Sequence, residues 1–171
     1  MVSPKAGANE MNAAAILKLK GVKTVVTTTA DKSMLDVAKL LTQHSIGCIV
    51  IERDDGEVAG IVAERDLMRA IGQSGAKVLM EPVSVYMTKT VVTARETNTS
   101  DQLMSEMTLH RFRHMPVVER GRLLGLVSIG DLVKIHVADA EFESDALRQY
   151  ITPQPSVIFD QASRLRLAGG A

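Results

Sequence analysis

The sequence has almost no aromatic residues and a single cysteine. It contains no Trp, two Tyr and three Phe, and its one cysteine is Cys48. So few rings exclude a platform that stacks single-stranded bases, and one cysteine cannot form an intramolecular disulfide. A chain without a disulfide framework is typical of a reducing compartment. We therefore expect a cytoplasmic location.

Net charge and long apolar runs are missing too. The 171 residues carry 20 basic and 20 acidic side chains, and a net charge of zero argues against binding nucleic acid through a globally basic surface. No apolar run reaches the roughly 18 residues that a membrane span needs, and residues 1–12 lack the apolar core of a signal peptide. We expect neither a membrane nor a nucleic acid as partner.

The neutral total conceals an uneven choice of basic residues. Before position 86 the chain has seven Lys and three Arg, and after it two Lys and eight Arg. Four of these arginines cluster near His110 and His114: Arg111, Arg113, Arg120 and Arg122. Because the planar guanidinium suits phosphate and carboxylate better than the lysine ammonium does, the cluster is a candidate phosphate site. A solvated basic strip is the alternative interpretation.

The chain also contains an internal repeat. Three features of the first half return in the second, shifted by 66 positions or, after one deletion, by 65: 24–27 at 90–93, His44 at His110, and 60–62 at 125–127. The deletion falls in a Gly-containing turn, where a duplicated unit tolerates a change of length. A duplication of this regularity sets the architecture.

Each repeat predicts the order β-α-β-β-α. Apolar and β-branched runs predict three strands per repeat: 24–28, 48–51 and 58–62, then 90–93, 115–118 and 123–127. The first helix should bury Leu35, Ala38, Leu41 and Thr42 after a capping box at Ser33, and the second should bury Leu103, Met104 and Met107. The closing helices begin at Glu64 and Ile129. The helix after the first strand allows a parallel crossover, and the Gly turn makes the last two strands a hairpin.

The predicted fold class is therefore α/β, with two β-α-β-β-α repeats packed sheet to sheet about a pseudo-twofold axis. One repeat of about 55 residues is too small to bury a core alone. We place the first repeat at 13–80, the second at 81–138, a C-terminal helix at 139–151 and a tail of unassigned role at 152–171.

Two segments carry a family resemblance. Gly-Ile-Val-Ala-Glu-Arg-Asp at 60–66 and Gly-Leu-Val-Ser-Ile-Gly-Asp at 125–131 resemble the hallmark of the CBS domain (cystathionine β-synthase type). Two copies in tandem resemble a CBS pair, or Bateman module, across residues 13–138. The resemblance implies that AMP, ADP, ATP or an NAD(H)-like nucleotide binds in the clefts between the repeats. It also implies a homodimer of modules.

The aspartates of these segments are the candidate ribose ligands. In the CBS-domain family, which these segments resemble, the Ser/Thr-x-x-Asp segment holds the ribose hydroxyls. Ser128 and Asp131 fit that pattern. A carboxylate can accept two hydrogen bonds from a cis-diol, although the same spacing also forms a helix capping box. In the first repeat Ala63 replaces the hydroxyl residue, which leaves Asp66 with Arg65 beside it.

The remaining candidate ligand residues come from the strand entries. The resemblance places the nucleotide phosphate at Arg113 and His114, with Arg111, Met115 and Pro116 adjoining. Their repeat partners Gly47 and Cys48 are uncharged. The missing side chain of Gly47 lets the backbone and a ligand approach each other. By the resemblance Thr24, Ile46 and Thr90 line the clefts, and plain β-propensity is the other explanation for them.

Catalysis and metal binding find little support in the sequence. It has no nucleophile elbow, phosphate-binding P-loop or dinucleotide fingerprint. The pairs His44–Cys48 and His110–His114 have metal-ligand spacing but lack a third ligand. We therefore predict a stand-alone regulatory sensor, with no enzymatic activity, no catalytic cofactor and an unidentified regulated protein. The alternatives are a protein-interaction module without a ligand and nucleic-acid binding through residues 111–122.

Overall fold

The first repeat forms a three-stranded sheet with two helices on its outer side. The computed structural model describes residues 11–21 and 25–151. The elements of this repeat are β1 (Thr27–Thr28), α2 (Met34–His44), β2 (Cys48–Glu52), β3 (Val58–Ala63) and α3 (Glu64–Ser74). β1 lies parallel to β2, and β2 pairs with β3 in an antiparallel hairpin. The predicted crossover and hairpin are both confirmed.

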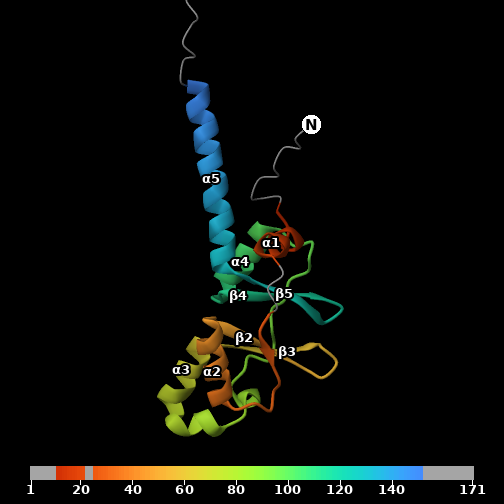
Figure 1. The fold of residues 1–171 in the computed structure, drawn as a ribbon, viewed down its shortest axis with the longest axis vertical. Helices are drawn as coiled ribbons and strands as arrows, with labels where there is room; N and C mark the ends of the chain where they lie inside the picture. Colours follow the sequence, from red (N-terminus) through yellow and green to blue (C-terminus); the bar gives the residue numbers. More distant parts are fainter. Residues whose placement is uncertain (1–10, 22–24, 152–171) are drawn as a thin grey trace, which may run out of the picture.

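The second repeat faces the first across the middle of the molecule (Figure 1). Its elements are α4 (Ser100–His110), β4 (His114–Glu119), β5 (Arg122–Ser128) and α5 (Ile129–Ile151). The short 3-10 helices η2 (Ala76–Met80) and η3 (Val83–Val85) lie between α3 and α4, and α1 (Ala13–Lys20) comes before β1. The two sheets meet face to face with helices outside, as the predicted fold class requires.

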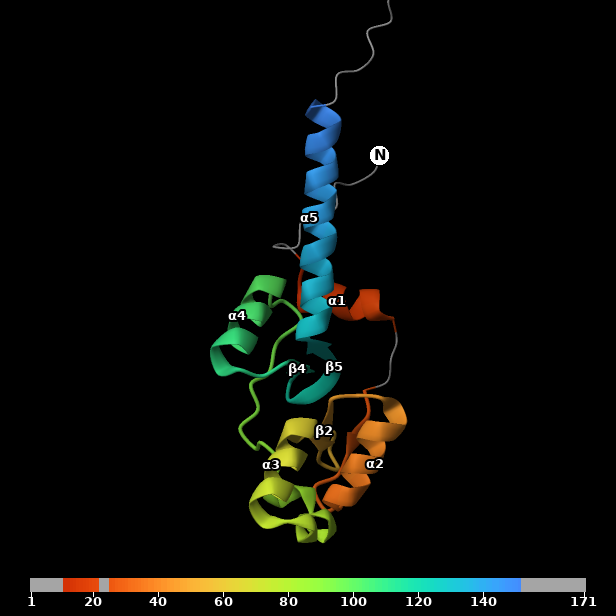
Figure 2. The same cartoon turned by 90° about the vertical axis from the view of Figure 1, so that its left-hand side faces the viewer.

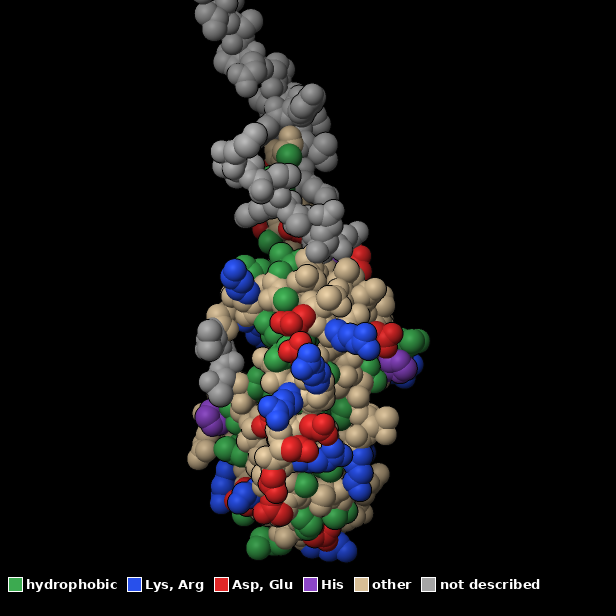
Figure 3. All heavy atoms as spheres, turned by 90° about the vertical axis from the view of Figure 1, so that its right-hand side faces the viewer, with side chains coloured by type: hydrophobic (Ala, Val, Ile, Leu, Met, Phe, Trp, Pro, Cys, Tyr) green, Lys and Arg blue, Asp and Glu red, His purple; other side chains and the backbone are tan. Residues whose placement is uncertain are grey.

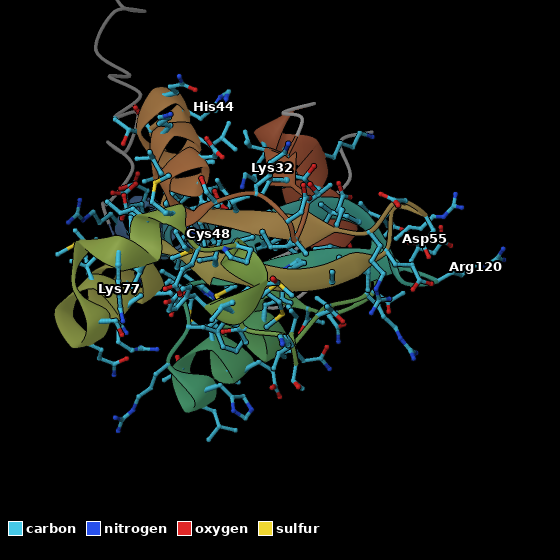
Figure 4. All side chains as sticks on the ribbon, turned by 90° about the horizontal axis from the view of Figure 1, so that it is seen from below. Lys32, His44, Cys48, Asp55, Lys77 and Arg120 are labelled. Atoms are coloured by element: carbon cyan, nitrogen blue, oxygen red, sulfur yellow. The ribbon has the colours of Figure 1, made fainter. Side chains whose placement is uncertain are left out.

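The two hairpin turns lie side by side at one end of the stacked sheets. The backbone N–H of Val58 donates to the carbonyl of Gly121 over 3.2 Å, and Glu57 bridges to Arg122. Viewed from below, Asp55 and Arg120 mark this end, whereas Cys48 lies well inside it (Figure 4). Arg120 and Arg122 therefore belong to the turn region and not to a common cluster with Arg111 and Arg113.

The predicted strand at 90–93 is wrong. The second repeat keeps only an isolated parallel bridge between Ala94 and Val117, in which Ala94 N–H donates to the carbonyl of Pro116. The next rung toward the amino end would require a backbone N–H from residue 116, and proline has none. In the first repeat β1 comprises only Thr27 and Thr28, and Thr24 lies outside the described residues.

The predicted helix α2 is confirmed, but its buried face differs by one position. Met34, Val37 and Leu41 are buried, whereas Thr42 is exposed and donates its hydroxyl hydrogen bond to the carbonyl of Ala38. The Ser33 side chain caps the helix by accepting from Asp36 N–H at 3.1 Å. The apolar stripe that packs on the sheet therefore runs through positions 34, 37 and 41.

Each repeat has its own apolar core, but α1 crosses to the core of the second. Ala13 and Ile16 are buried with Leu103, Met107 and Met115, although chain order groups α1 with the first repeat. A Cβ on Gly125 would lie 2.6 Å from Leu17 Cδ2, so glycine is what allows α1 to press on β5. The repeat partner Gly60 similarly accommodates Met87, in the segment between η3 and α4: a Cβ on Gly60 would lie 2.6 Å from Met87 Sδ.

Helix α5 projects away from the two sheets (Figures 1 and 2). It is one continuous helix of 23 residues. The helix therefore has no interruption at the boundary predicted between residues 138 and 139. The predicted tail at 152–171 lies outside the described residues. Across the described part of the chain, we find no helix with both the length and the apolar character that crossing a membrane requires.

Candidate functional site

Two cavities lie at the seam between the sheets. The first, which we call the arginine cleft, has a volume of about 300 Å³ and is lined by four arginines together with Asp66: Arg65, Arg69, Arg111 and Arg113. The second, the Lys20 cleft, has a volume of about 610 Å³ and is lined by Lys20, Ser128 and mainly apolar side chains. Both volumes lie within the range usual for small-molecule sites.

The arginine cleft combines residues from both repeats. Arg65, Asp66 and Arg69 come from the first turns of α3, whereas Arg111 and Arg113 come from the connection between α4 and β4. Arg111 ends α4 in the left-handed conformation, with φ of 58°. Its repeat partner Ser45 ends α2 in the same way. The chain can therefore turn sharply from helix to strand at this position and bring its basic residues to the seam.

Asp66 occupies the position predicted for a ribose ligand and also caps its helix. Its Oδ2 accepts a 2.9 Å hydrogen bond from Ala63 N–H, and Arg69 Nη1 lies 3.4 Å from Oδ1. Ala63 provides no hydroxyl, so Asp66 alone caps the start of α3 through its side chain. The carboxylate lines the cavity and keeps acceptor positions for a ligand, because a carboxylate has about four lone-pair sites.

Asp131 is held more tightly than Asp66. Its Oδ2 accepts hydrogen bonds from Ser128 N–H at 2.8 Å, from the Ser128 hydroxyl at 2.7 Å and from Lys20 Nζ at 2.8 Å. Burial by itself would raise the pKa of Asp131. The hydrogen bonds from Lys20 and Ser128, together with the Lys20 charge, outweigh burial and hold that pKa below its usual value.

Lys20 is the residue that the sequence analysis missed. Its ammonium donates to Asp131 and, over 2.8 Å, to the carbonyl of Leu126. Lys20 and Ser128 line the cavity, and both are hydrogen-bonded to Asp131. A signal was present: Ala13, Ile16 and Lys20 have the spacing of one helical face, so a helix that buried the first two residues would also turn Lys20 inward. Nothing in the sequence indicated that this helix docks on β5.

Cys48 and His114 form a shared wall between the two cavities. They are partners in the repeat, each begins the first strand of its hairpin, and both line both clefts. Burial raises the pKa of the Cys48 thiol to about 12. Burial, followed by the charges of Arg113 and Lys20, lowers the pKa of His114. A neutral thiol and a neutral imidazole therefore separate the clefts at neutral pH.

The other predicted residues divide between the two clefts. Thr90 lines the arginine cleft, whereas Ile46 and Gly47 line the Lys20 cleft. A Cβ on Gly47 would lie 3.3 Å from His114 Cε1, so the glycine lets the two repeats approach closely. Met115 and Pro116 are buried within β4 and line neither cavity. Thr24 lies outside the described residues, so its predicted role stays a prediction.

The two pairs with metal-ligand spacing, His44–Cys48 and His110–His114, do not have the geometry of a metal site. α2 ends at His44 and α4 ends at His110, each followed by a left-handed residue before the strand begins. His110 Nε2 lies 3.4 Å from Glu106 Oε2 on its own helix. Within the described ranges, no three His, Cys, Asp or Glu side chains gather as a metal site would require.

The surface shown in Figure 3 mixes basic and acidic side chains. Blue and red groups alternate along this face, with hydrophobic groups between them, and neither sign forms a continuous field. Long-range steering of nucleic acid requires such a field. By contrast, the four arginines of the arginine cleft line one common cavity.

Comparison with known proteins identifies the same repeat. The sequence profile described as "CBS domain" matches residues 21–73 and 83–137. A crystal structure of a CBS-domain-containing protein from Agrobacterium tumefaciens is 48% identical, with a TM-score of 0.69, and the match covers 72% of this chain and 97% of that chain. A mitochondrial CBS domain-containing protein of Arabidopsis thaliana is 33% identical over 72% of this chain, and the match spans 62% of that relative.

One similar structure was solved with adenosine compounds. It is a CBS domain pair in complex with 5′-methylthioadenosine and S-adenosylmethionine, 25% identical, with a TM-score of 0.66. The match covers 74% of this chain and 96% of that chain. The fold built from the two repeats is thus the fold of proteins some of which bind adenosine ligands.

Proposed function

This chain belongs to the CBS-domain family and carries two copies of the domain, and from that premise we propose that it is a regulatory module whose arginine cleft binds an adenine nucleotide. AMP, ADP, ATP and NAD(H) all present the required groups: an adenine, a ribose diol and at least one phosphate. The observation that carries the proposal is one carboxylate among four guanidinium groups in a cavity between the repeats.

The polar groups of the arginine cleft suit the two polar parts of a nucleotide. Asp66 is the acceptor for the ribose hydroxyls, because its Oδ2 already accepts from Ala63 N–H and orients the carboxylate. Arg65, Arg111 and Arg113 supply planar donor forks for the phosphate. These arginines come from both repeats, so a bound phosphate is attracted to each of them.

The apolar groups of the same cleft suit the adenine. Its lining includes Ile61, Val91, Val92 and Phe112, so an adenine inserts between aliphatic side chains and a single ring. Burying apolar ligand surface contributes roughly 25 cal/mol per Å². The base is thus held mainly by aliphatic side chains, with Phe112 as the one phenyl ring among the residues that line the cleft.

Regulation follows from the position of the cleft between the repeats. A ligand that contacts α3 of one repeat and the α4–β4 connection of the other favours the arrangement in which both contacts form. We propose that this arrangement is what a regulated protein recognises, that the module assembles as a homodimer in the cytoplasm, and that the chain itself catalyses no reaction.

Calorimetric titration tests the proposal directly. We expect AMP, ADP, ATP or NADH to bind the wild-type protein with a dissociation constant below roughly 1 mM. The Asp66→Ala variant should bind at least tenfold more weakly, which corresponds to a loss of about 1.4 kcal/mol in binding free energy. Arg113→Ala should lose a similar factor for the nucleotides but not for adenosine. Asp54→Ala, in the exposed β2–β3 turn, is the matched control. No binding of any nucleotide would contradict the proposal.

Protein interaction without a ligand is the second candidate function. Helix α5 projects from the sheets and carries exposed Val133, Val137 and Phe142, which is more apolar surface than a solvated helix needs. This function would be favoured over the sensor if titration detects no nucleotide binding and light scattering shows that the protein self-associates.

A further inference from the structure

We propose that helix α5 is a dimer contact of this protein and packs antiparallel on α5 of a second copy. This inference rests on the homodimer of the proposed function and deepens it, because it assigns the surface and the register of the contact. It follows from the spacing of small and apolar residues along α5, from their exposure, and from the order of charges along the helix.

One face of α5 has the residue spacing of a coiled coil. We call it the α5 stripe, and its described residues follow one another at intervals of four, three and four: Val133, Val137, Ala140 and Ser144. The sequence continues the spacing with Leu at position 147 and Ile at position 151. Alternating intervals of three and four define the a and d positions of a heptad repeat, which is the face that one helix of a coiled coil packs against another.

The α5 stripe is accessible in the single chain. Leu132 and Ile135, on another side of the helix, pack the base of α5 on the core of the second repeat. By contrast, Val133 is 48% exposed and Val137 is 50% exposed, and Ala140 is exposed as well. Two half-exposed valines one turn apart are apolar surface that a second helix can bury.

The distal half of α5 extends beyond the family domain. The CBS-domain profile ends at residue 137, whereas the helix continues to Ile151. Figures 1 and 2 show this continuation standing clear of both sheets and of the other described helices. Isolated helices shorter than about 12–15 residues are marginal in water, so residues 138–151 gain stability when the α5 stripe is covered. A second α5 provides that cover.

The order of charges along α5 favours an antiparallel pair. Lys134 and His136 precede an acidic run that includes Asp139, Glu141 and Asp145. In a parallel pair each run lies level with its own copy, and like charges repel. In an antiparallel pair the basic end of each helix lies level with the acidic run of the other.

The spacing of the stripe sets the register of the pair. In an antiparallel coiled coil, an a residue of one helix packs beside a d residue of the other. Pairing Val137 with Ala140 of the second copy also pairs Val133 with Ser144 of that copy, and a twofold axis repeats both contacts. Residue 133 of one copy then lies about 16 Å along the axis from residue 133 of the other, at 1.5 Å per residue.

A charge placed in the α5 stripe tests the surface. We expect Val137→Glu to raise the dimer dissociation constant at least tenfold in sedimentation velocity, because the new carboxylate is buried in the contact. Phe142→Glu is the matched control: Phe142 is 68% exposed but lies on the opposite side of the helix from Ala140 and Ser144, at 100° per residue. It should leave the dimer unchanged. An equal loss in both variants, or none in Val137→Glu, would overturn the inference.

A charge exchange tests the orientation. The proposed register brings Lys134 of each copy within about one helical turn of Glu141 of the other, at the positions that flank the stripe. Lys134→Glu should therefore weaken the dimer at least about fivefold, and adding Glu141→Lys should restore it. If the second change weakens the dimer further, the antiparallel register is wrong.

Disulfide cross-linking measures the register directly. The native Cys48 is buried and its thiol pKa is raised to about 12, so new cysteines on α5 react without competition. We expect a mixture of Val133→Cys and Ser144→Cys proteins, oxidised with glutathione disulfide, to form the mixed disulfide dimer. Neither variant alone should cross-link, because identical positions lie about 16 Å apart along the axis, beyond the reach of a disulfide.

The outcomes separate this inference from folding and from the proposed function. Thermal unfolding checks that each variant is folded, and each should bind AMP as the wild-type protein does. Cross-linking of either cysteine variant alone would mean a parallel pair and overturn the inference. A dimer without the mixed disulfide would also overturn it, and the proposed homodimer would then use another surface. A wild-type protein that binds AMP as a monomer would overturn the inference and the homodimer but leave the nucleotide site.

Discussion

At the scale of single residues, the carboxylate of Asp131 joins three secondary-structure elements: α1, β5 and α5. Its Oδ2 accepts from the backbone and hydroxyl of Ser128 and from Lys20, which lies 111 positions away in the sequence. The same contacts that cap α5 also fix α1 against the second repeat. The same carboxylate thus forms a helix cap and a tertiary ion pair. The cap that the sequence predicted is confirmed, and the ligand role of Asp131 stays a prediction.

The stability of the fold should depend on this carboxylate being ionised. The pKa of Asp131 is depressed in the folded protein, whereas in the unfolded chain it is about 3.9. A depressed pKa stabilises the fold above about pH 4, and this contribution is lost as the pH falls through the folded-state pKa. We expect Asp131→Asn to cost about 2 kcal/mol in free energy of unfolding at neutral pH, with the cost shrinking as the pH falls through the lowered pKa of the folded state.

Urea unfolding of the wild-type and Asp131→Asn proteins across this pH range measures the effect. The exposed Asp54→Asn variant should show no comparable difference at any pH. A difference between the Asp131 variant and the wild-type protein that stays constant from neutral to acidic pH would mean that the charge of Asp131 does not contribute to stability.

At the scale of secondary-structure elements, the repeat is less symmetric than its sequence. β1 pairs with β2 through Thr27 and Thr28, but the matching segment of the second repeat keeps one bridge at Ala94 because Pro116 lacks an N–H. Conversely, α1 has eight residues, whereas the segment that matches it in the repeat, residues 79–86, contains the short helix η3. Such differences give each repeat its own neighbours and make the two clefts unlike.

The docking of α1 on β5 depends on Gly125. Since a Cβ there would lie 2.6 Å from Leu17 Cδ2 and 2.7 Å from Cδ1, we expect Gly125→Ala to force the Leu17 side chain aside, to loosen the packing of α1 and to destabilise the protein by about 1 kcal/mol. Denaturant unfolding measures the loss. Weaker AMP binding in the Lys20 cleft should accompany it, because Lys20 moves with α1.

A double-mutant cycle provides the control for this contact. Leu17→Ala combined with Gly125→Ala should cost less than the sum of the two single changes, because the shorter side chain makes room for the new methyl group. Gly72→Ala, in α3 with nothing within 4 Å of the added carbon, should instead stabilise by about 0.5–1 kcal/mol through helix propensity. Strict additivity of the two single changes would place the clash elsewhere.

At the scale of the whole molecule, the two clefts share one wall. Cys48 and His114 border both cavities, and packed side chains are displaced as units. A ligand that moves the imidazole of His114 in one cleft therefore changes the shape of the other. We expect occupancy of the arginine cleft to change the affinity of the Lys20 cleft for AMP by a factor of about 5–150.

Calorimetric titrations with AMP at both sites measure this coupling. His114→Ala should bring the factor close to one by removing the shared side chain, whereas His44→Ala, an exposed histidine at the end of α2, should leave it unchanged. By linkage, the Lys20 cleft must act on the arginine cleft by the same factor. Two independent sites in the wild-type protein would contradict the coupling.

The sequence by itself determined the features that depend on local periodicity and motif spacing. The duplication, the hairpins at 48–62 and 115–127 and the caps at Ser33 and Ser128 were all predicted, because turns, caps and strand patterns act over a few residues. The buried face of α2 differs from the prediction because residues 34–41 contain two overlapping apolar stripes, and only packing decides which one meets the sheet. The strand at 90–93 failed because of a proline on the neighbouring strand.

Only the tertiary structure decided which charge meets which. Arg113 lies in the cleft of Asp66, whereas Asp131 is paired with Lys20; neither pairing is encoded by spacing along the chain. The ion pair forms because Gly125 lets α1 pack on β5, and that packing depends on surfaces contributed by residues more than a hundred positions apart. Long-range packing therefore made two similar repeats into two different clefts.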